Sequence, residues 1–88
     1  MFTIELLPTA HGDAIWIEYG EEDHPRRVVV DGGPASTYEN GLRRRILEVG
    51  QERTLDLLMV THIDADHIDG ALILLQEIDA LKVKIGEL

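Results

Sequence analysis

The sequence predicts an α/β fold in which strands and helices follow one another in the order β-β-β-α-β-α-β. Three observations support this prediction. Short runs rich in β-branched and aromatic residues fill the first third of the chain. Two later segments carry apolar residues at helical spacing. Between these segments lies an apolar run followed by a charged loop, and such loops at strand ends are where α/β sheets assemble their sites.

Three strands are expected first. Apolar and polar residues alternate over residues 2–6, and Pro8 ends the pattern. Residues 13–20 form the second expected strand. The third covers residues 28–31, where three consecutive valines indicate a strand buried on both faces.

The first helix is expected to begin near Tyr38, with Thr37 as its cap, and to stop at Gly50. Its inward face would consist of Tyr38, Leu42, Ile46 and Val49. A buried strand follows at residues 55–60.

The second helix is expected over residues 68–81. Its inward face would consist of Leu72, Leu75, Ile78 and Leu81. Residues 82–88 resemble the start of a further strand, which would leave an open sheet edge. We therefore expect residues 1–88 to be part of one larger domain, truncated at its C-terminal end, or to pair with another copy or another chain.

Composition excludes several classes of protein. The chain is 44% hydrophobic and 28% charged, which argues against disorder. A formal charge of −9 disfavours a basic nucleic-acid-binding module. The sequence has no cysteine, so a metal would be held by nitrogen and oxygen. With no apolar run long enough for a bilayer and no signal peptide at the start, we expect a cytoplasmic protein without membrane contact.

The charged loop after the strand at 55–60 carries the candidate chemistry. His62, Asp64 and Asp66 alternate, so in an extended segment their side chains would converge on one point, and His67 would serve a second point nearby. Clustered carboxylates repel one another unless a cation neutralises them. The alternative is a solvated acidic loop in which Asp66 or Asp69 caps a helix. The spacing does not fit an EF-hand calcium loop, since Ile68 replaces an oxygen ligand.

The loop also resembles a known family. Residues 61–70, Thr-His-Ile-Asp-Ala-Asp-His-Ile-Asp-Gly, resemble the His-x-His-x-Asp-His metal motif of the metallo-β-lactamase fold superfamily, and residues 28–33 resemble its strand-Asp-Gly segment. Residues 11–20 are similar to a strand of the competence-protein-like branch, which also carries His-x-Asp-x-Asp-His. Asp64 replaces the second His of most members, and Asp69 replaces a Gly. The resemblance implies the N-terminal portion of an αββα sandwich.

This resemblance implies roles for single residues. His62 and Asp64 would bind a first metal, and Asp66 and His67 a second, with Asp66 also orienting or deprotonating the attacking water. Asp31 would support a ligand histidine by a hydrogen bond. His11 and Asp13 are candidates for the mouth of the site, although a turn before a strand, with Asp13 bonding local backbone, is the favoured explanation of these residues.

The implied activity is hydrolysis by a site with two divalent ions, zinc, manganese or iron. The carboxylate of Asp64 would shift the preference away from zinc. A small-molecule substrate, with a phosphodiester or similar anion favoured, is expected. The alternative is a non-catalytic fragment or pseudoenzyme subunit that folds by associating with another chain. Taken alone, residues 1–88 would hold an incomplete, weak and inactive site.

Overall fold

The protein is described by a computed structural model that covers residues 1–9, 13–50, 52–61 and 65–87, without the side chains of residues 65–67. The strands are β1 (Phe2–Leu6), β2 (Ile15–Gly20), β3 (Pro25–Val30), β4 (Arg53–Leu55), β5 (Leu57–Met59) and β6 (Val83–Ile85). The helical segments are η1 (Ala35–Thr37), η2 (Glu39–Arg43), α1 (Arg44–Val49) and α2 (Ala65–Gln76). The mixed α/β class predicted from the sequence is confirmed.

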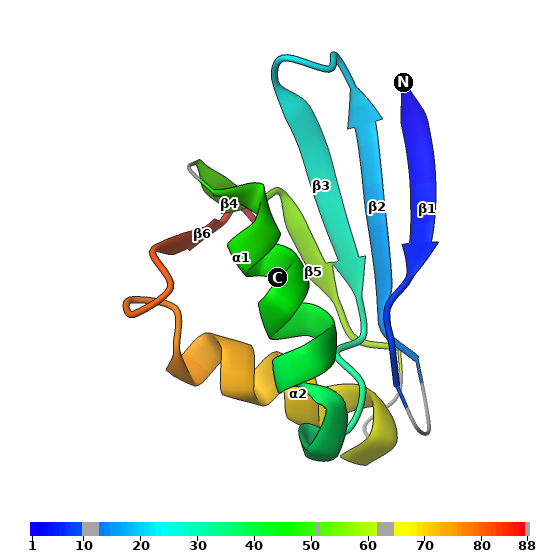
Figure 1. The fold of residues 1–88 in the computed structure, drawn as a ribbon, viewed down its shortest axis with the longest axis vertical. Coiled ribbons are helices and arrows are strands. Elements are labelled where there is room, and N and C mark those ends of the chain that lie inside the picture. Colours follow the sequence, from blue (N-terminus) through cyan, green and yellow to red (C-terminus); the bar gives the residue numbers. More distant parts are fainter. Residues whose placement is uncertain (10–12, 51, 62–64, 88) are drawn as a thin grey trace.

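Four strands form the main sheet in the order β1-β2-β3-β5 (Figure 1). The first three are antiparallel neighbours, and β5 joins β3 in parallel, with Val30 opposite Met59. Strands β4 and β6 pair in parallel as a second, two-stranded sheet. The connection from β3 to its parallel neighbour runs through α1, as a crossover requires.

The single strand predicted over residues 55–60 is divided at Asp56. Its carboxylate accepts the backbone N–H of Arg27 at 2.7 Å, and its own N–H donates to the Arg27 carbonyl at 2.8 Å. These two bonds bend the chain between Leu55 and Leu57, so β4 pairs with β6 while β5 pairs with β3. The apolar run gave no sign of this bend, because only Asp56 interrupts it.

The core lies between one face of the main sheet and the helices. Trp16, Val29 and Leu58 project from three adjacent strands and are at most 1% exposed. They belong to one apolar cluster with Leu42 from η2 and Leu74 from α2. No helix formed by the described residues covers the opposite face of the sheet (Figure 1). Val28 and Val30 point there and are only partly buried, so the prediction that this strand is buried on both faces was wrong.

The first predicted helix is present as η1, η2 and α1 in succession. Tyr38, Leu42 and Ile46 are buried as predicted. Gly50 ends the helix with φ of +79°, a conformation that glycine adopts without strain. Thr37 does not cap the helix, because its hydroxyl donates to the Pro34 carbonyl at 3.4 Å.

The second helix begins and ends earlier than predicted, at Ala65 and Gln76 instead of Ile68 and Leu81. Its inward face was also assigned wrongly in part. Ala71 and Leu74 are buried, whereas Leu72 and Leu75 are 47% and 37% exposed. Residues 71–75 are all apolar, so both helical phases fit this segment equally well. Ile78 and Leu81 do contact the core, but from the turn that follows the helix.

Within the described residues, no helix has the length and apolar content that crossing a bilayer demands.

Candidate functional site

The carboxyl ends of β3 and β5 lie side by side at the same end of the main sheet, which we call the sheet edge of the site (Figure 1). Asp31 follows β3 directly, and Thr61 follows β5 by two residues. This edge therefore holds both Asp31 and the start of the charged loop that the sequence singled out. Helix α2 begins at Ala65, four residues after Thr61.

Asp31 and Thr61 form a clamp between these strand ends. The Asp31 side chain is 1% exposed. Its Oδ1 accepts the Thr61 backbone N–H at 2.8 Å, and its Oδ2 accepts the Thr61 hydroxyl at 2.6 Å. The Asp31 N–H donates to the Met59 carbonyl at 2.7 Å. Since buried carboxylates need such donors, these bonds hold the residue that immediately precedes His62.

The backbone of Asp31 is left-handed, with φ of +61°. Aspartate tolerates this conformation better than most residues, and it turns the chain sharply out of β3. The turn brings Gly32 and Gly33 against α2, where the Gly70 N–H donates to the Gly33 carbonyl at 2.8 Å. A Cβ on Gly70 would overlap the Gly32 carbonyl oxygen. The sequence pattern did not indicate this close crossing of helix and loop.

The structure describes only part of the predicted set of metal ligands. Asp66 and His67 lie in the first turn of α2. The expectation that Asp66 continues an extended segment after His62 and Asp64 was therefore wrong, because the helix starts three residues earlier than predicted. His62, Asp64 and the side chains of Asp66 and His67 lie outside the described part of the chain, so their convergence remains a prediction.

Among the side chains that the structure describes, no three His, Asp or Glu groups gather as they would around a metal ion. The predicted hydrogen bond between Asp31 and a ligand histidine also concerns residues beyond the described set. What the structure adds is Thr61, which sequence reasoning did not single out. The available signal was a hydroxyl residue directly after a buried strand and directly before His62.

Asp13 belongs to the loop between β1 and β2. Ile15 pairs with Val30, so this loop lies at the same sheet edge as Asp31. The Asp13 side chain is exposed. This position is compatible with the predicted mouth of a site, and the role itself remains a prediction. His11 falls outside the described residues.

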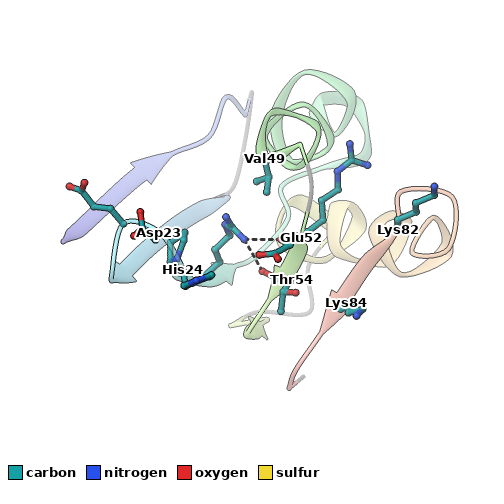
Figure 2. A pocket seen from close by; sticks show the side chains of 11 residues that line it. Asp23, His24, Val49, Glu52, Thr54, Lys82 and Lys84 are labelled. Carbon is teal, nitrogen blue, oxygen red and sulfur yellow. Dashed lines mark hydrogen bonds between the residues drawn. The ribbon is translucent and has the colours of Figure 1, made fainter.

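A cavity of about 730 Å³ lies elsewhere, between the β2–β3 hairpin and strands β4 and β6. In Figure 2, Asp23 and His24 lie on one side, Lys82 and Lys84 on the other, with Glu52 between them. The hairpin precedes β3, so this cavity is at the opposite end of that strand from Asp31. Its charges of both signs are spread around an open rim, and it is separate from the candidate site.

Comparison with known proteins found one informative similarity. The chain is 33% identical over 72 residues to a hydroxyacylglutathione hydrolase of Photobacterium profundum. The match covers 80% of this chain and 25% of that protein, so the chain spans about a quarter of the length of the curated relative. No protein-family description matches the sequence. No solved structure matches it either.

Proposed function

We propose that this chain is part of a metal-dependent hydrolase of the metallo-β-lactamase superfamily, in its His-x-Asp-x-Asp-His variant. The observation that carries the proposal is the clamp between Asp31 and Thr61, which fixes the start of the motif at a strand-end edge. The similarity to hydroxyacylglutathione hydrolase, an enzyme of the same superfamily, supports it independently.

The four proposed ligands suit a pair of divalent ions. His62 and Asp64 would hold one ion, and Asp66 and His67 the other. Two imidazoles and two carboxylates form a nitrogen and oxygen donor set that fits zinc, manganese or iron. When bound, such ions lower the pKa of water and polarise a substrate oxygen. The family's remaining metal ligands would be histidines and aspartates that lie outside this motif.

The chain's own residues contribute positioning and proton transfer. Asp66 is the proposed base, and it orients the attacking water. Its location in the first turn of α2 ties it to Gly70, whose N–H is bonded to the Gly33 carbonyl. Thr61 and Asp31 act as positioning residues, because they hold the backbone next to His62. The charge of the Asp31 carboxylate is balanced by donors and stays out of the chemistry.

We propose two candidate classes of substrate. A phosphodiester or similar anion is favoured by the variant motif, since its additional carboxylate suits the harder metals that act on phosphates. A hydroxyacylglutathione is the second candidate, because the similar curated protein carries that name. Both are substrates for attack by an activated water, so the same residues serve either reaction.

The product of the complete reading frame should be loaded separately with zinc, manganese and iron, and its metal content measured by elemental analysis. Hydrolysis of a bis-aryl phosphodiester and of a hydroxyacylglutathione is then followed for each form. We expect two ions per chain and activity with manganese at least equal to that with zinc. Asp64→His should shift the preference towards zinc, because it restores a nitrogen donor.

Asp66→Ala should reduce kcat by roughly a hundredfold or more, with little change in stability. Asp23→Ala is the matched control, since Asp23 is an exposed aspartate in the hairpin at the other end of β3. Protein that binds no metal, or an Asp66→Ala variant that retains full activity, would contradict the hydrolase proposal and favour the non-catalytic alternative.

A further inference from the structure

The loop between β1 and β2 lies at the sheet edge of the site. Ile15 begins β2 and pairs with Val30, the last residue of β3, so the residues just before Ile15 lie at that edge. The two ends of the loop are fixed, because the Leu7 N–H donates to the Ala14 carbonyl at 2.8 Å and both residues are buried. Any displacement of the loop is therefore confined to the residues between Leu7 and Ala14.

The loop touches the turn that follows β3 through one methyl group. A Cβ added to Gly33 would lie 2.7 Å from Thr9 Cγ2, whereas nonbonded carbon atoms prefer separations of about 3.5–4.0 Å. The next nearest atoms, Thr9 Cβ and Thr37 Oγ1, are both 3.6 Å from the same point, which is an ordinary contact. A side chain at position 33 would therefore collide with the Thr9 methyl group alone.

A second glycine meets the same loop. Gly41 is buried in η2, and a Cβ added there would lie 2.7 Å from the Pro8 carbonyl oxygen. This oxygen belongs to the backbone, so no rotation of a side chain relieves the contact. Residues 8 and 9 thus fit against the turn and against η2 because neither Gly33 nor Gly41 carries a side chain.

Of the two partners in the contact between Gly33 and Thr9, the turn is held more firmly. The Gly33 carbonyl accepts the Gly70 N–H at 2.8 Å, and both Gly32 and Gly33 are buried. Thr9 is only half-buried, and the preceding Pro8 is exposed. A side chain at position 33 should therefore displace Thr9, and not the turn.

We infer that Gly33 and Gly41 are positioning residues for the substrate of the proposed hydrolase. By leaving room for residues 8 and 9, they set the place of the β1–β2 loop beside the substrate, an inference that rests on the proposed function. Asp13, in the same loop, is exposed at the sheet edge of the site. The proposed metal ligands belong to another segment, residues 62–67. Displacing the loop should therefore weaken substrate binding and leave metal binding intact.

The test measures KM, kcat and metal content for the product of the complete reading frame. The substrate is whichever of the bis-aryl phosphodiester and the hydroxyacylglutathione the wild-type protein hydrolyses. Gly33→Ala should raise KM by roughly tenfold and change kcat by less than about threefold, because it disturbs binding and not the reacting groups. Gly41→Ala should have the same effect, since it displaces the same loop. The metal content of both variants should equal that of wild type.

Thr9→Ser separates the contact from other effects of a side chain at position 33. It removes Cγ2, the methyl group that the added Cβ would meet. The KM of the double variant with Thr9→Ser and Gly33→Ala should therefore lie within about threefold of the KM of Thr9→Ser. Thr9→Ser combined with Gly41→Ala should keep its raised KM, because the Pro8 carbonyl oxygen is still in place.

Gly20→Ala is the matched control for backbone strain. Gly20 has a left-handed backbone with φ of +92°, comparable to the +70° of Gly33, and no described atom lies within 4 Å of a Cβ added there. It ends β2 at the opposite end of that strand from Ile15. Its KM should stay within about twofold of wild type.

Circular dichroism and thermal unfolding verify that each variant is folded at the assay temperature, and Gly41→Ala carries the test if Gly33→Ala does not fold. A folded variant with the KM of wild type, or one that loses its metal, would overturn this inference while the proposed function stands. The same holds if Thr9→Ser fails to restore the KM of Gly33→Ala, or if Gly20→Ala raises KM equally. Wild-type protein that binds no metal and hydrolyses neither substrate would contradict the proposed function and this inference together.

Discussion

At the scale of single residues, the clamp between Asp31 and Thr61 depends on the Thr61 hydroxyl. Thr61→Val keeps the backbone N–H and the shape of the side chain but removes the donor to Asp31 Oδ2. A buried carboxylate that loses a donor should lower the free energy of unfolding by about 1–3 kcal/mol. Thr61→Ser retains the hydroxyl and should lose less than about 0.5 kcal/mol. Urea unfolding of both variants measures the difference, and equal stabilities would show that the hydroxyl bond contributes nothing.

The surroundings of Tyr38 predict how the stability of the fold changes at alkaline pH. Its hydroxyl donates to Glu77 Oε1 at 2.9 Å. Burial, then the hydrogen bond and negative charge of Glu77, raise the pKa of Tyr38 well above its usual value of 10.0, with a smaller contribution from Glu39 and an opposing one from Arg43. A raised pKa in the folded state means that the stabilisation is complete below about pH 10 and is lost as pH rises towards the folded pKa.

Tyr38→Phe removes both the hydrogen bond and the titrating group. At pH 8 the variant should be about 1 kcal/mol less stable than wild type. Above pH 10 wild type should lose this advantage, so the two unfolding midpoints should converge. Chemical unfolding at a series of pH values provides the measurement, and Tyr19→Phe, at an exposed tyrosine, is the control. A constant difference across the whole pH range would contradict the assignment.

At the scale of elements, α2 depends on the absence of a side chain at Gly70. Alanine is favoured over glycine inside a helix by about 1 kcal/mol. At Gly70, however, a Cβ would overlap the Gly32 carbonyl oxygen, which belongs to backbone and cannot rotate away. Gly70→Ala should therefore destabilise the fold by roughly 2 kcal/mol or more. This sign is opposite to the one that helix propensity predicts.

Gly50→Ala is the comparison for this variant. Gly50 has φ of +79°, but nothing lies within 4 Å of the position of its Cβ. Its substitution should cost only about 1 kcal/mol of backbone strain. Thermal unfolding of both variants separates the steric effect from the conformational one. A Gly70→Ala variant as stable as wild type would mean that α2 shifts freely against the 32–33 turn.

The elements also show which features the sequence could predict. Strand β1 was predicted with its observed bounds, because alternation and Pro8 leave one interpretation. The inward face of α2 was assigned wrongly in part, because residues 71–75 are all apolar and do not show which side of the helix faces the core. The division at Asp56 arises from two bonds to Arg27, a residue 29 positions away. Local pattern carries no information about such a partner, and the same holds for the crossing of Gly32 and Gly70.

For the candidate site, the sequence predicted the location better than the arrangement. Asp31 and the residues around the charged loop do meet at one sheet edge, as strand ends in such folds do. The extended geometry assumed for Asp66 was wrong, since α2 already begins at Ala65. Whether a charged segment is extended or helical depends on what holds its ends. Here the two flanking contacts are the bond from Thr61 to Asp31 and the bond from Gly70 to Gly33. Neither contact can be inferred from the amino-acid composition of the segment.

At the scale of the whole molecule, metal binding should stabilise the fold, because the proposed ligands belong to the segment that runs from the end of β5 into the first turn of α2. An ion that binds only the native state adds RT ln(1 + [L]/Kd), about 2.7 kcal/mol at a hundredfold excess over Kd. In a domain of this size that raises Tm by roughly 10 °C or more. Residues 1–88 alone should bind weakly, so their Tm should rise only slightly at millimolar manganese or zinc. The product of the complete reading frame should show the full shift.

His67→Ala and His24→Ala separate site binding from adventitious binding. His24 lies exposed on the β2–β3 hairpin, at the other end of β3 from the candidate site. We expect His67→Ala to abolish most of the metal-dependent rise in Tm and His24→Ala to leave it unchanged, measured by differential scanning fluorimetry at one protein concentration. EDTA should return the wild-type protein to the Tm of metal-free His67→Ala within about 2 °C, since one substitution near a helix start changes stability little without metal. If both histidine variants lose the shift equally, or neither does, the ions are bound outside the 62–67 loop.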